Sequence, residues 1–400
     1  MKYFRFLLLF FLIFLRCNTI NIISNDFTIE IPEAAIIEPP LTEDQIEQVD
    51  RQVAKQLDKM HFNGNVLIAY KGYPVARYSN GYRHFFNKQK LNHETAFQLA
   101  SVSKAFTAMA VLMLQQKGKL NILDTVSQHI PEFPYRDITI KNLLQHTSGL
   151  QNYMYFVDGQ WDKEKRLTYS DVLDLLVQNN SQLSFRPGQR HYYSNTGYAI
   201  LALLVERVSG MPFDQYMKIN IFDPLDMQHT FVWNQKTMDT ITNIATGFKR
   251  YRKKYASVGH EPLDEIGGDK SVYSTIDDML KWDRAWSSNQ LISDTLIQLA
   301  FTKTVTGRNR IHDYGLGWRF TEIDNKPVIY HNGLWNGFTT SFHRFIADSI
   351  TVIVLNNTNG HASSVARQLY ITAQEEISRF KTRENASDNL AEMTPRGKTK

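Results

Sequence analysis

Apolar and polar residues follow two different periods along the chain, and each period predicts a different kind of element. Four apolar residues recur at helical spacing near the N-terminus: Ile46, Val49, Val53 and Leu57. Thr42 precedes them, with Gln45 three residues later, which is the spacing of a capping box. We therefore predict a helix that begins directly after Thr42.

Six short segments rich in β-branched and aromatic residues predict strands, two near the start of the chain and four near its end. They are residues 65–70, 74–78, 315–320, 328–331, 339–345 and 351–355. The first two flank Lys71-Gly72-Tyr73, a predicted hairpin turn. The four late strands would otherwise lack a partner, so we expect both groups to join in one antiparallel sheet.

Helical patterns dominate the rest of the chain. The predicted helices are residues 101–116, with Gly118 as C-cap, 170–177, 197–208, a helix capped by Ser274, and 364–380. Residues 122–264 should form a mostly helical lobe inserted between the two strand groups. We expect a cleft where this lobe meets the sheet. The polar tail, residues 382–400, is expected to be disordered.

The first 17 residues have the pattern of an export signal. Lys2 and Arg5 precede an unbroken apolar run, residues 6–15, which is too short to span a bilayer and fits a signal-peptide core. Cys17 follows, as in a bacterial lipoprotein signal, although Arg16 occupies the place of the small residue expected there. Two alternatives stay open for an exported, periplasmic or membrane-anchored protein: a lipid anchor at Cys17, or soluble export.

The composition fits one large domain that follows a linker. Residues 18–41 carry three prolines and predict a linker, and residues 42–381 are predicted to form the domain. The formal charge is +5, and it falls to +2 (5 minus 3) without the three basic residues of the leader. That charge is too mild to imply a nucleic-acid partner. Without Cys17 the body has no thiol, which excludes disulfides, thiolate metal sites and cysteine catalysis.

Ser101-Val102-Ser103-Lys104 places a hydroxyl and an amine three positions apart, on one face of a predicted helix. A serine in the first turn also lies near unpaired N–H groups. In a cleft of low dielectric, Lys104 would favour the alkoxide that Ser101 must form to attack a substrate. The tetramer recurs at residues 378–381, near the end of a helix and without partner motifs, and we interpret that copy as chance.

Tyr193-Ser194-Asn195 supplies a second candidate group. A phenol is a poor base at its ordinary pKa near 10, but a lysine ammonium beside it would lower that pKa toward neutrality. Tyr193 would then take the Ser101 proton and later pass it to the leaving group, while Asn195 would donate to a substrate carbonyl. The alternative is an ordinary core tyrosine. Residues 78–80 repeat the pattern at the end of a strand, and we interpret them as turn chemistry.

His331-Asn332-Gly333 ends a predicted strand and supplies a third candidate. Gly333 would let a substrate backbone approach the strand closely. His331 would place a polar, chargeable group in the cleft. The alternative is a surface histidine whose hydrogen bonds are satisfied by its surroundings.

Three motifs therefore occur in one order along the chain: Ser101-x-x-Lys104, Tyr193-x-Asn195 and His331-x-Gly333. In this order they resemble those of the serine β-lactamase and penicillin-binding-protein superfamily. A tyrosine opening the second motif is similar to the branch with class C β-lactamases, D-Ala-D-Ala carboxypeptidases, D-aminopeptidases and esterases. Flanking segments that add to the resemblance are residues 143–150 (LLQHTSGL), 186–188 (RPG), 314–318 (YGLGW) and 337–338 (GF).

The resemblance implies an α/β (α+β) fold, with an antiparallel sheet flanked by helices plus a mostly helical lobe. It implies hydrolysis through an acyl-Ser101 intermediate, with no cofactor and no metal. It also implies an oxyanion hole made by the backbone N–H groups of Ser101 and Leu334. The implied catalytic residues are Ser101, Lys104 and Tyr193, and the implied substrate-binding residues are Asn195, His331, Gly333 and Leu334.

The third motif of β-lactamases in this branch is Lys-Thr-Gly, and here His331 stands in place of the lysine. Histidine at this position is typical of the peptidase and esterase members of the branch. We therefore expect D-amino-acid peptides, such as those derived from peptidoglycan, or esters as substrates. Two alternatives stay open: a β-lactamase, and a sensor that binds penicillin or cell-wall peptides without turnover.

Other enzyme classes leave no complete signature. His93-Glu94 begins like a zinc helix, but Phe97 stands where the second histidine is required. The chain has no Gly-x-Ser-x-Gly, phosphate loop or dinucleotide fingerprint. The basic residues between positions 250 and 254 are interpreted as a solvated loop.

Overall fold

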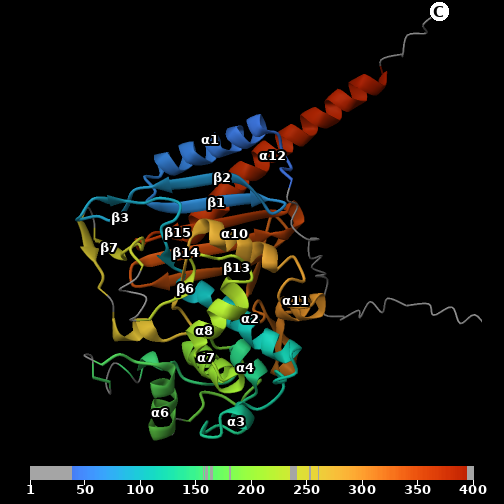
Figure 1. Cartoon of the computed structure of the whole chain (residues 1–400). Coiled ribbons are helices and arrows are strands. Elements are labelled where there is room, and N and C mark those ends of the chain that lie inside the picture. The colour runs from blue at the N-terminus through green and yellow to red at the C-terminus, as the bar shows by residue number, and fades with distance from the viewer. Residues whose placement is uncertain are drawn as a thin grey trace, which may run out of the picture.

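Six antiparallel strands form the central sheet, in the order β12-β13-β14-β15-β1-β2 (Figure 1). Their bounds are β1 Gly64–Tyr70, β2 Tyr73–Asn80, β12 Arg319–Ile323, β13 Lys326–Trp335, β14 Phe338–Phe345 and β15 Ile350–Asn356. β1 pairs with β15, with Leu67 opposite Ile353. Strands from both ends of the chain thus meet inside one sheet, which confirms the predicted pairing of the two strand groups.

The computed structural model describes residues 38–155, 157, 161–162, 165–179, 182–234, 241–251, 254–259 and 261–393. The expected leader, residues 18–37 of the expected linker, and residues 394–400 lie outside this part of the chain. Within it, no helix combines the length and the apolar character needed to cross a bilayer.

Helices cover both faces of the sheet. α1 (Glu43–Lys59) and α12 (Ala362–Met393) lie on one face, where Val66 belongs to their shared core. Leu67, the next residue, belongs to the larger core shared with the helical lobe. Because successive side chains of a strand point to opposite faces, β1 is buried along its whole length. Each fully buried Val, Leu or Ile side chain of this strand contributes about 1.5–3 kcal/mol.

The predicted capping box of α1 is confirmed. The Thr42 hydroxyl accepts from the Gln45 backbone N–H at 3.3 Å, and the Gln45 side chain accepts from the Thr42 N–H at 2.9 Å. Val49, Val53 and Leu57 face the sheet side of the helix and are buried. Helical spacing in the sequence therefore identified the face of α1 that packs on the sheet.

The helical lobe lies against the other face of the sheet (Figure 1). Its helices, and those that connect it to the sheet, are α2 Ser103–Gln116, α3 Val126–His129, α4 Ile140–Leu144, α6 Tyr169–Asn179, α7 Asn195–Ser209, α8 Phe213–Met217, α10 Ile276–Ala285 and α11 Asp294–Ala300. α2 packs against α7, and both are buried over most of their length. A helix that is apolar all round belongs in a core, so these two helices form a rigid support for the residues at their N-termini.

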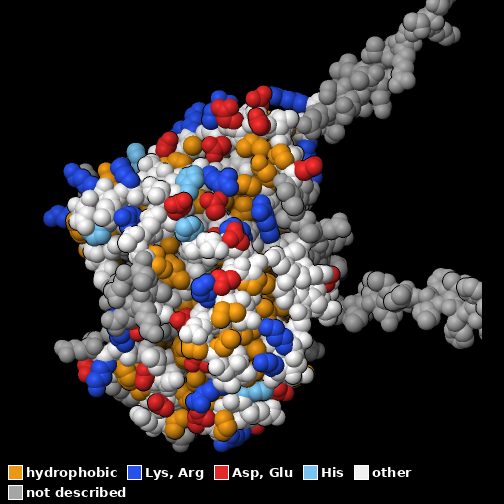
Figure 2. Space-filling view, in the orientation of Figure 1, with side chains coloured by type: hydrophobic (Ala, Val, Ile, Leu, Met, Phe, Trp, Pro, Cys, Tyr) orange, Lys and Arg blue, Asp and Glu red, His pale blue; other side chains and the backbone are white. Residues whose placement is uncertain are grey.

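Short strands join the lobe to the sheet. β5 Phe97–Gln98, β9 Val272–Ser274 and β6 Phe231–Val232 form a small three-stranded sheet directly before Ser101. Three hairpins complete the set: β3 Tyr82–His84 with β4 Gln89–Lys90, β7 Phe248–Tyr251 with β8 Lys254–Ser257, and β10 Thr304–Thr306 with β11 Arg310–His312. The basic segment noted in the sequence falls at the β7–β8 hairpin, where Lys249 and Lys254 are exposed. Figure 2 shows acidic and basic side chains intermixed over most of the face it draws.

Two predicted boundaries near Ser101 and Lys104 differ from the structure. Residues 101–102 lie in a 3₁₀ turn, η1 (Ala100–Val102), and α2 begins only at Ser103. Residues 315–318 do not extend the strand, because Gly317 has φ +81° and a Cβ there would lie 3.0 Å from the Lys104 carbonyl oxygen. This segment is a turn pressed against α2, which its apolar composition did not indicate.

Two more expectations need correction. Thr275, not Ser274, caps α10: its hydroxyl accepts from the Asp278 N–H at 3.2 Å, while Ser274 is the last residue of β9. The tail expected to be disordered from residue 382 is helical as far as Met393, because α12 continues to that residue. Neither Gly nor Pro occurs between residues 382 and 393, so no helix breaker interrupts it.

Candidate active site

Ser101 lies in the tight turn between β5 and α2. Ala100 before it is buried and has φ +49°, in the left-handed region that residues with a Cβ rarely adopt. The turn is tied to β9, because the Leu99 N–H donates to the Val272 carbonyl at 2.8 Å. Strained backbone of this kind collects at functional sites, where the surroundings hold it in place.

Lys104 is 0% exposed, and its amine lies 3.2 Å from the Ser101 hydroxyl oxygen. The same amine donates to the backbone carbonyl of Asp269 at 2.8 Å. Burial lowers the pKa of Lys104 to about 7, since a charged amine is disfavoured away from water, while Asp269 raises this pKa and Arg319 lowers it further. At neutral pH a large share of Lys104 is therefore an uncharged amine that can accept a proton.

Tyr193 lies directly before α7 and faces the same amine. The Lys104 Nζ atom is 5.0 Å from the centroid of the Tyr193 ring. The guanidinium carbon of Arg319 also lies 5.0 Å from that centroid. The Tyr193 hydroxyl is buried and makes no hydrogen bond of normal geometry to the described residues. The structure thus brings Ser101, Lys104 and Tyr193, predicted from two separate motifs, to one place.

The expected direction of the Tyr193 pKa was wrong. Burial raises the pKa of Tyr193 above its ordinary value, although Ser101 and Arg319 lie near enough to oppose that rise. A neighbouring ammonium alone would lower the pKa of a phenol, but desolvation dominates here. The phenol therefore keeps its proton in the resting site, and Lys104 is the group better suited to take the proton of Ser101.

Asn195 is the first residue of α7, two positions after Tyr193. Its Nδ2 atom lies 3.8 Å from the sulfur of Met154, which is a weak acceptor. Its Oδ1 atom is buried and has no hydrogen-bond partner among the described residues. A buried amide without a good partner costs free energy unless a ligand supplies one, so Asn195 holds an unsatisfied acceptor close to Tyr193.

His331 on β13 is buried and neutral, not the chargeable group expected in the cleft. Its Nε2 atom lies 3.3 Å from the Tyr314 hydroxyl, and its Nδ1 atom lies 2.8 Å from the Asn332 carbonyl. Burial, with Arg319 and Lys104 nearby, holds the pKa of His331 well below its ordinary value. The alternative of a surface histidine is wrong too, because the ring is 1% exposed.

A chain of hydrogen bonds fixes the tautomer of His331. The Ser194 N–H donates to His146 Nδ1 at 3.2 Å, so His146 carries its proton on Nε2 and donates to the Tyr314 hydroxyl at 3.1 Å. Tyr314 then donates to His331 Nε2, and the Nδ1–H of His331 donates to the Asn332 carbonyl. Every donor in this chain has an acceptor, which is what buried polar groups require.

Gly333 lies against the turn that carries Ser101. A Cβ at Gly333 would be 2.2 Å from the Leu99 carbonyl oxygen and 2.2 Å from the Thr340 hydroxyl oxygen. The space expected to receive a substrate backbone is therefore occupied by the chain itself. Leu334 is the next residue of β13 and is 68% exposed.

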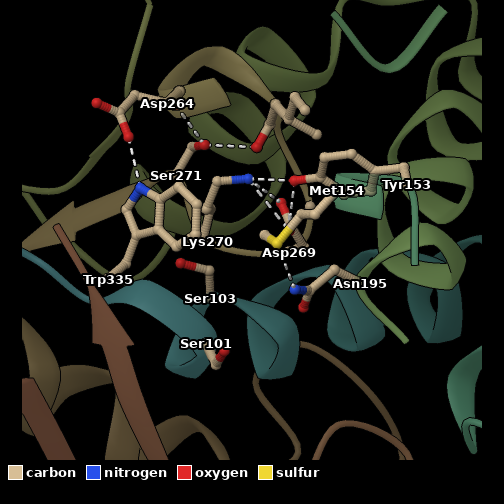
Figure 3. A network of polar contacts seen from close by, with 12 residues as sticks. Ser101, Ser103, Tyr153, Met154, Asn195, Asp264, Asp269, Lys270, Ser271 and Trp335 are labelled. Atoms are coloured by element: carbon tan, nitrogen blue, oxygen red, sulfur yellow. Dashed lines mark hydrogen bonds and ion pairs between the residues drawn. The ribbon is translucent and has the colours of Figure 1, made fainter. Parts of the chain in front are cut away.

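A buried polar network beside Ser101 was not predicted. Figure 3 shows Lys270 between Trp335 and Tyr153, with Ser103 and Ser101 near it. Its amine lies 4.8 Å from the Trp335 ring centroid and contacts the Tyr153 hydroxyl. The only signal in the sequence was a charged pair, Asp269-Lys270, directly before a short apolar strand. Propensity and periodicity give no reason to expect both charges inside the protein.

Arg319 and Tyr314 were missed as well. Both lie in or beside the segment 314–318, which the sequence singled out only for its resemblance to a family pattern. Arg319 follows that segment at the start of β12, and it contacts the faces of the Tyr193 and Tyr314 rings. The available signal was Arg319 itself, a basic residue directly after an apolar segment that contains glycine.

The two chance copies of the motifs lie away from this site, as interpreted from the sequence. Tyr78 donates to Asp58 at 2.8 Å and accepts from Asn80 at 2.9 Å, so it links β2 to α1. Ser378 is exposed on α12. Among the described residues, no group of three or more His, Cys, Asp or Glu side chains is placed to hold a metal ion.

Comparison with known proteins identifies the family. The profile of the Beta-lactamase family matches residues 49–375. A penicillin-binding protein of Bacillus subtilis (strain 168) is 34% identical over 311 residues, which cover 75% of this chain and 69% of that protein. The crystal structure of a penicillin binding protein from Bacillus halodurans has TM-score 0.71 and 25% identity, over 82% of this chain and 99% of that one. FmtA from Staphylococcus aureus has TM-score 0.71 and 21% identity, over 86% and 93% of the two chains.

The chain therefore belongs to the Beta-lactamase family. The superfamily and the α/β fold expected from the three motifs are confirmed. Membership supports a function of the serine hydrolase type, and it agrees with the position of Ser101 beside a buried amine.

Proposed function

We propose that the chain is an exported serine hydrolase that cleaves amide or ester bonds through an acyl-Ser101 intermediate. The observation that carries this proposal is the 3.2 Å contact between the Ser101 hydroxyl and the fully buried amine of Lys104. A hydroxyl becomes a useful nucleophile only when a base stands within hydrogen-bonding distance of its proton.

In the acylation step, neutral Lys104 takes the proton of Ser101 as the serine oxygen bonds to the substrate carbonyl carbon. The carbonyl oxygen gains the electron pair, and the backbone N–H groups of Ser101 and Leu334 bind the resulting anion. Collapse of this intermediate breaks the bond to the leaving amine or alcohol, which takes the proton of the Tyr193 phenol. The Lys104 ammonium returns its proton to Tyr193, so charge and protons balance.

Hydrolysis of the acyl-enzyme uses the same groups. A water molecule loses a proton to Lys104 as its oxygen bonds to the acyl carbon. Ser101 then leaves with that proton and regains its hydroxyl, and the product is a carboxylic acid. The oxyanion contribution is about 3 kcal/mol of barrier lowering for each donor, by analogy with other acyl-transfer enzymes.

The charges around Ser101 and Tyr193 favour an anionic substrate. His331 and His146 are neutral, since the pKa of each is held well below its ordinary value. The guanidinium of Arg319, over the Tyr193 ring, is then a fixed cation beside the reacting groups. A peptide with a free C-terminal carboxylate fits this arrangement, and so does an ester of an acidic compound.

D-amino-acid peptides or esters are accordingly our proposed substrates, ahead of β-lactams. The third motif carries a neutral histidine where β-lactamases of this branch carry lysine. The relatives from Bacillus subtilis and Bacillus halodurans are named for binding penicillin, which supports acylation of Ser101 by penicillin even where turnover of the drug is slow. Peptidoglycan-derived peptides are the natural compounds of this chemical class.

The proposal of export rests on the sequence of the first 17 residues alone. Both forms stay open, a lipid anchor at Cys17 and soluble export. Mass spectrometry of the mature N-terminus after expression in a bacterium decides between them. A diacylated Cys17 supports the anchor, a free N-terminus beyond Cys17 supports soluble export, and an uncleaved Met1 contradicts export.

The proposed function is tested by hydrolysis of a panel: D-Ala-D-Ala peptides, D-amino-acid amides, p-nitrophenyl esters and a chromogenic cephalosporin. We expect Ser101→Ala to abolish every activity that the wild type shows. Ser378→Ala is the matched control, because it changes the serine of the other Ser-x-x-Lys copy on an exposed face of α12. Equal activity of Ser101→Ala and wild type would contradict the proposal. Labelling of Ser101 by penicillin without release would indicate a sensor that does not turn over.

A further inference from the structure

The loop at residues 264–272 connects β13 with α2 beside Ser101. Asp264 accepts from the Trp335 indole N–H at 2.5 Å, at the end of β13. At the other end of the loop, the Val272 N–H donates to the Ser103 hydroxyl at 3.0 Å. Between them the Gly268 carbonyl accepts from the Thr107 hydroxyl at 2.8 Å. The loop is thus attached to the first two turns of α2 and to the strand on the opposite side.

Asp269 is the point where this loop meets both lysines. Its backbone carbonyl accepts from Lys104, and its carboxylate oxygens lie 3.2 and 3.3 Å from the amine of Lys270. The Tyr153 hydroxyl donates to the same carboxylate at 3.0 Å (Figure 3). Asp269 is 0% exposed and Lys270 is 2% exposed, so water screens neither charge.

We propose that Asp269 and Lys270 are positioning residues that act through Lys104. The Asp269 carboxylate serves as the counter-charge of the catalytic amine, and Lys270 shares that counter-charge. This inference rests on the proposed function, because it assigns what sets the behaviour of the base in that mechanism.

Two buried amines, Lys104 and Lys270, share one buried carboxylate. Titratable and charged groups face Lys104 from every element around it: Tyr193 and Tyr198 at α7, His146 after α4, Asp269 and Lys270 before β9, Arg319 on β12 and His331 on β13. Asp269 supplies the carboxylate in this set, and it raises the pKa of Lys104. Lys104 lowers the proton affinity of Lys270 by repulsion, and burial acts in the same direction. Because repulsion between two charges is mutual, a charged Lys270 disfavours a charged Lys104 in turn.

The two charges therefore predict opposite effects. Lys270→Met leaves the whole Asp269 charge to Lys104. This change raises the pKa of Lys104 and moves the acidic limb of the pH–rate profile to higher pH. Asp269→Asn removes the counter-charge, which lowers the pKa of Lys104 and moves the acidic limb to lower pH. We expect a shift of about one pH unit in each case, because a buried charge a few ångströms away changes a pKa by this order. Lys270→Arg keeps the charge and should restore the wild-type limb.

The measurement is the rate of acylation of Ser101 by a fluorescent penicillin, and the rate of p-nitrophenyl acetate hydrolysis, across pH in the full chain. Lys218→Met is the matched control, since Lys218 is exposed and pairs with Asp223 at 2.5 Å on the surface. Melting temperature is recorded for every variant. Asp269→Asn keeps the shape of the side chain, and if it fails to fold, the sign of the Lys270→Met shift tests the inference by itself.

Shifts of the acidic limb in opposite directions for Lys270→Met and Asp269→Asn support the inference. Unchanged limbs with lower plateau rates, or shifts in the same direction, would show that the pair has a structural role alone and would overturn it. Those outcomes leave the proposed function intact, because the wild type would still be labelled at Ser101. Absence of Ser101-dependent labelling in the wild type would overturn both.

Discussion

Lys104 places its amine 3.2 Å from the hydroxyl of Ser101, while the lysine side chain itself is cut off from water. An exposed lysine would be charged at neutral pH and could not accept a proton. Burial lowers the pKa of Lys104 to about 7, which converts the residue into a base in the range where the enzyme would work. The contact and the burial are thus both required for the proposed mechanism.

The first prediction concerns pH. Because the base must be uncharged, activity should rise as pH increases through about 7, the pKa of Lys104. The measurement is the pH dependence of acylation by a fluorescent penicillin under single-turnover conditions. A rate that stays constant between about pH 6 and about pH 8 would contradict the role of Lys104 as base.

The second prediction concerns Tyr193. Tyr193→Phe removes a buried hydroxyl that makes no normal hydrogen bond to the described residues, so the fold should keep its melting temperature. Turnover should fall by about 10²–10⁴-fold, the usual contribution of a general acid or base. Tyr192→Phe is the matched control, because the neighbouring ring is exposed. Full turnover by Tyr193→Phe would remove this residue from the mechanism.

The third prediction concerns Gly333. An added methyl group would lie 2.2 Å from the Leu99 carbonyl oxygen, so Gly333→Ala must displace either β13 or the turn before Ser101. Overpacking of this kind costs about 1–3 kcal/mol, and acylation should slow at least about tenfold because the nucleophile moves. The control is Gly259→Ala, where nothing lies within 4 Å of the added methyl. Equal stability and activity of the two variants would show that the contact at Gly333 is unimportant.

The fourth prediction concerns stability in acid. The pKa values of His146 and His331 are held well below 6.5 in the folded chain, whereas the unfolded chain binds protons near the ordinary value. The unfolded state therefore gains protons first as pH falls, and stability is lost below about pH 6.5. Urea unfolding at about pH 7 and about pH 5 measures this loss. We expect His331→Gln to lose less stability on acidification than the wild type. An equal loss would contradict the assignment of His331 as a buried, neutral histidine.

Much of the fold was predictable because its patterns are local. The helical spacing of Val49, Val53 and Leu57 identified α1 and its buried face, and the strand patterns at both chain ends identified the sheet. Boundaries failed where a tertiary contact overrides the local pattern. Gly317 turns because α2 lies against it, and residues 315–318 look like a strand in the sequence.

The candidate site was predictable to the extent that its residues form spaced motifs. Ser101, Lys104 and Tyr193 were found in this way, and the structure brings them together. Asp269 and Lys270 were missed, because a charged pair in a sequence carries no sign that it will be buried. The pKa of Tyr193 was predicted in the wrong direction for the same reason: desolvation depends on packing around the group, which the sequence does not display.

The most direct test of the central claim is to locate the covalent adduct. The full chain is treated with a fluorescent penicillin, digested, and mapped by tandem mass spectrometry. We expect one modified residue, Ser101, with no adduct in Ser101→Ala and a much slower adduct in Lys104→Met. An adduct on Ser378 or any other residue, or labelling of Ser101 at an unchanged rate in Lys104→Met, would contradict it.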